Sequence, residues 1–140
     1  MPELVATYQT ALLALAVLAL ALVVQSFISG LVKNGIKAQP SGVPVTGDIS
    51  DSTFRIVRTH MNGIENASAL FAASLLAMIA GADAQWITWL VLAAVALRLV
   101  YWPLYVFRIG KDGAGLRTFT HVIALVVNIV IAVWAVAALM

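Results

Sequence analysis

The chain has 140 residues, of which 63% are hydrophobic and 10% are charged, and it contains no cysteine. Its mean hydropathy of +1.03 is far above that of a soluble domain, in which roughly half of the residues are apolar. We therefore expect an integral membrane protein. The absence of cysteine excludes disulfides, thiolate metal sites and a protein thiol nucleophile. The net charge of +2 gives no reason to expect a nucleic-acid partner, because the basic residues flank apolar segments.

Four segments are long and apolar enough to cross the hydrocarbon core, which requires about 20 residues of helix. The first contains an uninterrupted apolar run from Ala11 to Val24. No basic residue precedes it and no obvious small-residue cleavage site follows, so we interpret it as a retained helix rather than a signal peptide. The sequence thus predicts a single all-α domain, an integral membrane four-helix bundle, with helices at about 4–32, 53–81, 84–108 and 117–140.

The basic residues have an asymmetric distribution. All of them except Arg98 lie in or beside the first and third loops, whereas the termini and the second loop offer only Glu3 and Asp83. Because positive loops stay in the cytoplasm, we predict that the first and third loops are cytoplasmic and that both termini lie on the opposite side.

The first loop, "NGIKAQPSGVPVTGDISDS" (34–52), is longer than most connections, so it is either a lid over a site or a plain cytosolic tether. Near its end, Asp48, Ser50, Asp51 and Ser52 are all suitable N-caps for the second helix. The glycine-rich stretch "GKDGAGLR" (110–117) lacks the spacing and the Lys-Ser/Thr ending of a phosphate loop, and is interpreted as a flexible turn.

Two of the predicted helices carry polar stripes. The turn "GADAQ" (81–85) is short enough to make the second and third helices an antiparallel hairpin. A spacing of i, i+3, i+7 and i+10 places four polar residues within about an 80° arc of each helix. The stripes are Arg55, Arg58, Asn62 and Glu65 on the second helix, and Arg98, Tyr101, Tyr105 and Arg108 on the third.

Counted outward from the turn, Glu65 and Arg98 lie level with each other, about 25 Å from it and within a hydrocarbon core of roughly 30 Å. An arginine at the bilayer centre costs about 2.5–3.5 kcal/mol on insertion scales, and an unpaired buried carboxylate tends to take up a proton. We therefore predict an ion pair between Glu65 and Arg98 at the floor of a polar cleft. Its walls would be Asn62, Tyr101, Arg58 and Tyr105.

The alternative is that these polar residues only fasten the helices together. A binding site is favoured because the two stripes match at four heights and carry an excess of cationic donors. The level pairs are Glu65 with Arg98, Asn62 with Tyr101, Arg58 with Tyr105 and Arg55 with Arg108. His60 points away from the stripe of the second helix, which favours a contact with another helix over ligand binding. No second histidine or carboxylate stands near His60 at the spacing of metal ligands, so no metal site is expected. His121 and Asn128 share a face of the fourth helix with Arg117, and we expect them to bond to neighbouring helices.

Two segments resemble a known family. "FRIVRTHMNGIEN" (54–66) resembles the second-helix signature of the MAPEG family, the membrane-associated proteins of eicosanoid and glutathione metabolism, through Arg58, Asn62 and Glu65. "RLVYWPLY" (98–105) is similar to the third-helix segment with its two tyrosines. The resemblance extends over essentially the whole chain. It departs from the family at Ala69, where relatives have proline, and at Met61, which is basic in some of them.

The resemblance implies a homotrimer that binds glutathione between adjacent subunits from the cytosolic side. An arginine at the start of the fourth helix would stabilise the glutathione thiolate, and Arg117 is the best match, with Arg108 as a possible substitute because the connection before Arg117 is longer than in relatives. The Tyr105 hydroxyl could donate to the sulfur. By position, the glutathione-binding residues would be Lys33, Arg58, Asn62, Glu65, Tyr101 and Tyr105.

The sequence therefore favours an integral membrane glutathione transferase or peroxidase that acts on lipophilic electrophiles or hydroperoxides arriving from the bilayer. Glutathione would serve as the cosubstrate. The alternative keeps the fold without catalysis, as a membrane scaffold or a protein that binds a small anion or other ligand. A transporter subunit is disfavoured by the lack of internal repeats.

Overall fold

The computed structural model describes residues 2–36, 42–110 and 115–140, and the elements found there are all helical. Four of the helices are long and apolar enough to span a membrane, which confirms the predicted all-α class with four membrane-spanning helices. In chain order the elements are α1 (Pro2–Thr7), α2 (Gln9–Leu31), η1 (Val32–Ile36), α3 (Ser52–Ile79), α4 (Ala84–Val106) and α5 (Leu116–Leu139).

The first predicted helix is interrupted at Tyr8, between α1 and α2. The Tyr8 side chain is only 4% exposed, and its hydroxyl donates a hydrogen bond to the carbonyl of Ala82, in the turn after α3. This contact ties the start of the chain to the α3–α4 turn. Hydropathy cannot reveal this break, because the hydrogen-bond acceptor of Tyr8 lies 74 residues further along the chain.

The α3–α4 hairpin is built by local capping. After α3, Gly81 adopts a left-handed backbone with φ +74, and the N–H groups of Gly81 and Ala82 bond back to the carbonyls of Met78 and Ala77. This pair of bonds closes the last helical turn. The Asp83 carboxylate then accepts from the N–H of Trp86 and caps the start of α4.

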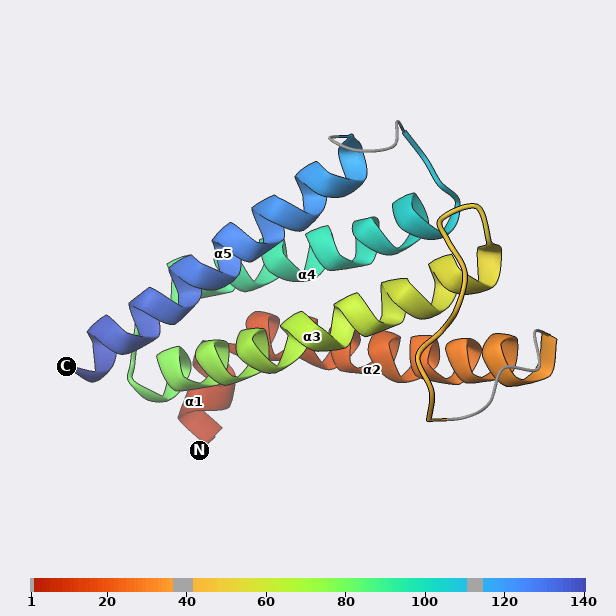
Figure 1. Ribbon diagram of the computed structural model, residues 1–140. Coiled ribbons are helices and arrows are strands. Elements are labelled where there is room, and N and C mark those ends of the chain that lie inside the picture. Colours follow the sequence, from red (N-terminus) through yellow and green to blue (C-terminus); the bar gives the residue numbers. More distant parts are fainter. Residues whose placement is uncertain (1, 37–41, 111–114) are drawn as a thin grey trace.

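The hydrophobic core lies in the half of the bundle that contains the α3–α4 turn. Figure 1 shows both termini and this turn at one end, and the segments before α3 and after α4 at the other. Two small residues of α3 contribute to this core, Ala73 and Ala77, which are 9% and 0% exposed. The other fully packed core residues include Ala11, Leu18, Leu70, Met78, Ile87, Val91, Ala94 and Ile131.

The half of the bundle away from this turn has a more polar interior. There α2 passes close to α3 at Gly63, where an added Cβ would come within 2.9 Å of a Leu22 methyl. At the start of α3, the Asp51 carboxylate accepts from the N–H of Thr53, so Asp51 is the N-cap among the candidates that the sequence offered. The polar stripes of α3 and α4 lie in this half.

Candidate functional site

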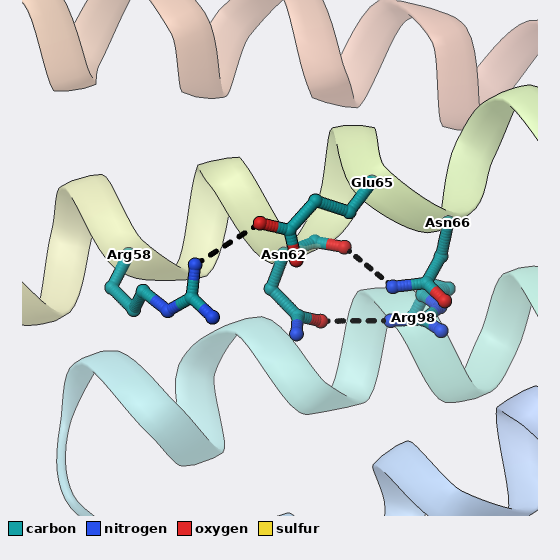
Figure 2. A network of polar contacts seen from close by, with 5 residues as sticks. All are labelled: Arg58, Asn62, Glu65, Asn66 and Arg98. Atoms are coloured by element: carbon teal, nitrogen blue, oxygen red, sulfur yellow. Dashed lines mark hydrogen bonds and ion pairs between the residues drawn. The ribbon is translucent and has the colours of Figure 1, made fainter. Parts of the chain in front are cut away.

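The predicted ion pair between Glu65 and Arg98 is not formed. Glu65 Oε1 instead pairs with Arg58 Nη1 at 3.1 Å, within α3, and the two side chains are 52% and 41% exposed. Arg98 Nη1 donates to Asn62 Oδ1 at 3.0 Å. Figure 2 shows these two contacts as separate interactions, one along α3 and one between α3 and α4. The prediction of the Glu65–Arg98 pair was therefore wrong.

Helix geometry explains the difference. Counting from the turn fixes the height of a residue on the hairpin but not the direction in which it points. Residues seven apart on a helix differ by only about 20° in direction, so Arg58 and Glu65 share one line along α3. Asn62 is rotated from both by roughly 40–60°. It is Asn62 that lies against α4, and the long Arg98 side chain reaches it.

Asn62 thus accepts hydrogen bonds from two polar side chains. Its side-chain oxygen accepts from Arg98, and its backbone carbonyl accepts from Asn66 Nδ2 at 2.8 Å. Asn66 belongs to the sequence Asn66-Ala67-Ser68, which matches a glycosylation motif but lies inside α3. The Asn66 amide is used for this internal hydrogen bond (Figure 2).

A polar cavity lies between the end of α4 and the start of α5, next to the loop before α3. Its volume is about 270 Å³. The Tyr101 and Tyr105 rings have centroids 5.6 Å apart, and Arg117 Cζ lies 5.9 Å from the centroid of the Tyr105 ring. Arg117 is only 5% exposed. The lining residues are Ile49, Tyr101, Tyr105, Arg117, Thr118 and His121.

This cavity brings together the two tyrosines and the arginine that the sequence singled out. Tyr101 lies within electrostatic range of three guanidinium groups, those of Arg58, Arg98 and Arg117. Such a concentration of positive charge favours an anionic ligand.

His121 is a lining residue to which the sequence analysis gave a different role. We expected it to bond to neighbouring helices, but its ring packs against Tyr101, with centroids 5.6 Å apart and planes tilted by 41°. One signal was available, because His121 lies four residues after Arg117 and therefore on the same face of α5.

Arg55 fixes the loop that forms one wall of the cavity. Its Nη1 donates to the carbonyls of Ile49 and Ser50, and its Nε donates to the carbonyl of Val106, each at 2.8 Å. The Ser50 hydroxyl and N–H both bond to Asp48, and these hydrogen bonds lower the pKa of the Asp48 carboxyl. The described end of the first loop is therefore held against the site, with Ile49 as part of its wall.

Five predicted residues do not line this cavity, namely Arg58, Asn62 and Glu65 of α3, together with Lys33 and Arg108. Lys33, in η1, donates a hydrogen bond to the carbonyl of Val43 in the first loop. Arg108 follows α4 in a left-handed conformation with φ 57. Residues 37–41 of the first loop and 111–114 of the glycine-rich turn lie outside the described residues, so the predictions made for them are not addressed.

A comparison with protein families matches residues 6–137 to the MAPEG family. The match covers nearly the whole chain, and the chain belongs to this family. It is accordingly a multi-pass membrane protein. No curated protein and no solved structure matches the sequence. The family includes glutathione transferases and peroxidases, and also members that are not catalytic.

Proposed function

We propose that the protein is an integral membrane glutathione transferase or peroxidase whose site is the polar cavity between α4 and α5. The observation that supports this most strongly is the position of Arg117, which is buried beside Tyr105 in a cavity lined by hydroxyl and imidazole groups. Family membership agrees with a glutathione-related activity.

Activation of the thiol is the step that this chemistry would serve. A thiol has a reference pKa near 8.5, so it is mostly protonated at neutral pH. A guanidinium within bonding distance lowers that pKa and raises the fraction of reactive thiolate. Arg117 would supply this cation and the Tyr105 hydroxyl would donate a hydrogen bond to the sulfur, while the thiol proton passes to water. The thiolate would then attack a lipophilic electrophile that enters from the bilayer, adding to it or displacing its leaving group. With a hydroperoxide, the thiolate would attack the terminal oxygen and break the O–O bond, which releases the alcohol after protonation by water and leaves a glutathione sulfenic acid. A second glutathione would reduce this to glutathione disulfide and water.

The remainder of glutathione carries two carboxylates and an ammonium group. Arginine binds carboxylates through paired hydrogen bonds, which suits Arg58, while Glu65 suits the ammonium group. Asn62 and Tyr101 would complete the binding residues. The Arg58–Glu65 pair is about half exposed, so a ligand can reach both groups without a buried ion pair having to separate.

The size of the cavity supports a site shared between subunits. Its 270 Å³ is just below the roughly 300–1,000 Å³ that small-molecule sites occupy. We propose a homotrimer in which a neighbouring subunit covers the exposed Arg58–Glu65 surface. Lys33, which does not line the cavity of its own chain, would then contact glutathione bound mainly by the neighbour. The basic loops beside the site would face the cytoplasm, where glutathione is available.

The second candidate is a protein that binds a ligand at this cavity without turning it over, since some members of the family are not catalytic. The two are separated by measuring conjugation of glutathione to a generic electrophile, using protein purified in detergent. We expect turnover by the parent, and a loss of at least about 100-fold in kcat for Arg117→Ala, within the range for removing one group that stabilises a developing anion.

Arg108→Ala is the matched control, because it removes the same charge outside the cavity lining. Its turnover should stay within a few-fold of the parent. If the parent binds glutathione saturably but shows no turnover with electrophiles or hydroperoxides, the result would instead support the second candidate, a ligand-binding protein without catalysis. Equal losses in the Arg117 and Arg108 variants would contradict the role assigned to Arg117.

A further inference from the structure

His121 is the titratable cavity residue to which the proposed function gives no role. It lies in α5, lines the polar cavity and packs its ring against Tyr101. Its Nδ1 is buried and has no hydrogen-bond partner among the residues that the structure describes. A histidine that only fastens helices together would be expected to make a hydrogen bond there. The imidazole is therefore available for the chemistry of the cavity.

The cavity has two levels along α4 and α5. At the first, Arg117 Cζ lies 5.9 Å from the centroid of the Tyr105 ring, and at the second, the His121 and Tyr101 rings have centroids 5.6 Å apart. His121 follows Arg117 by four residues, so it lies about 6 Å further along α5. Because α5 begins at the end of the bundle away from the α3–α4 turn (Figure 1), the level of His121 is the one nearer the hydrophobic core.

Among the side chains that line the cavity, an imidazole is best suited to move a proton. Its reference pKa near 6.5 allows it to take up and to release a proton near neutral pH. A tyrosine hydroxyl has a reference pKa near 10, and a guanidinium does not lose its proton in proteins. The charged groups within electrostatic range of His121 include Arg58, Glu65 and Arg98, and the Glu65 carboxylate is paired with Arg58.

We propose that His121 is a catalytic residue for hydroperoxide reduction, which makes lipophilic hydroperoxides a substrate class of this site. This inference rests on the proposed function. The His121 imidazole takes the proton of the glutathione thiol and delivers it to the alkoxide that leaves when the O–O bond breaks, so His121 takes the place of water in both transfers. The first transfer adds no net charge to the cavity, because the thiolate and the imidazolium form together.

The two levels suit the geometry of this reaction. The attacking sulfur and the leaving oxygen lie on opposite sides of the oxygen that is attacked. With the sulfur at the level of Arg117, the leaving oxygen lies toward His121 and its alkyl group toward the apolar half of the bundle.

Atoms and electrons balance in this step. The sulfur forms a bond with the terminal oxygen and is oxidised, while the O–O bond breaks and its electron pair goes to the inner oxygen. That oxygen receives the proton from His121, and the products are an alcohol and glutathione sulfenic acid. A second glutathione reduces the sulfenic acid and yields glutathione disulfide and water.

Two substrates test this role in full-length protein purified in detergent. Reduction of cumene hydroperoxide requires a proton for the leaving alkoxide, whereas conjugation of glutathione to chlorodinitrobenzene releases chloride, which requires none. His121→Gln keeps a polar side chain that cannot carry the proton. In this variant we expect the ratio of the two kcat values, reduction over conjugation, to fall at least about 100-fold, the lower end of what general acid–base catalysis contributes.

His60→Gln is the matched control, because it makes the same change at a histidine of α3 outside the cavity lining. It should keep the ratio of the parent. An unchanged ratio in His121→Gln, or a parent that conjugates glutathione but does not reduce the hydroperoxide, would overturn the role of His121 and leave the proposed function standing. A parent with neither activity would contradict the proposed function and this inference with it.

If His121→Gln fails to fold, the solvent isotope effect on the parent provides the second measurement. A proton that moves as the O–O bond breaks makes kcat for reduction fall in heavy water by a larger factor than kcat for conjugation. Equal effects on the two reactions would overturn the proposal.

Discussion

Asn62 and Glu65 lie one helical turn apart on α3, yet they have different surroundings. Asn62 accepts a hydrogen bond from Arg98, which is almost fully buried. Glu65 pairs with Arg58 on a surface where both side chains are about half exposed. A buried hydrogen-bond donor that loses its acceptor keeps the full cost of its desolvation, whereas an exposed ion pair contributes little to the stability of the fold. The stability of the bundle should therefore depend on the amide far more than on the carboxylate.

Replacing Asn62 with leucine leaves Arg98 Nη1 buried without its acceptor, and we expect a loss of about 1–3 kcal/mol in the free energy of unfolding. Glu65→Gln should cost roughly 0–1 kcal/mol, because it removes an exposed pair. Unfolding in detergent, followed by loss of helical circular dichroism, compares the two variants. Equal losses, or a larger loss for Glu65→Gln, would show that Glu65 supports the buried arginine after all.

At the scale of elements, the α3–α4 hairpin sets the height of every polar residue on its two arms. The hairpin depends on Gly81, whose φ of +74 lies in the left-handed region that side chains rarely adopt. Apart from its chain neighbours, no atom of the described residues lies within 4 Å of a Cβ added there, so the cost of a side chain comes from the backbone conformation.

Gly81→Ala should therefore lower the free energy of unfolding by about 1–2 kcal/mol, the cost of placing an L-residue in this conformation. Gly30→Ala is the matched control, since Gly30 lies in α2 with equally open space around a Cβ and without a positive φ. It should leave stability unchanged or raise it, because alanine is the better helix former. If both variants behaved alike in thermal unfolding, the left-handed turn would not be a determinant of the hairpin.

At the scale of the whole molecule, the number and type of the long helices could be predicted from sequence, because about 20 consecutive apolar residues have few alternatives to a membrane helix. The joint contribution of Tyr101, Tyr105 and Arg117 to one cavity also agrees with the resemblance. The Glu65–Arg98 pair could not be predicted correctly, because spacing along a hairpin gives height and leaves the rotation of each helix undetermined. The break at Tyr8 and the contact of Arg55 with Val106 depend on backbone carbonyls far away in sequence, which no side-chain pattern encodes.

The orientation in the membrane is a prediction for the whole molecule, based on the basic first and third loops. Because the chain has no cysteine, a single introduced thiol reports its own position. A membrane-impermeant thiol reagent applied to intact cells should label Gln85→Cys, beside the α3–α4 turn. It should label Ser50→Cys, in the first loop, only after the membrane is permeabilised. The reverse pattern would place the basic loops and the site outside the cell.

The most direct measurement is a titration of the purified protein with glutathione in detergent, followed by calorimetry and without any electrophile. The proposal that the polar half of the bundle is a glutathione site predicts saturable binding by the parent and binding at least about tenfold weaker in Arg58→Ala, since charge-assisted hydrogen bonds to a carboxylate contribute roughly 1.5–3 kcal/mol. A parent with no saturable signal up to millimolar glutathione would contradict it.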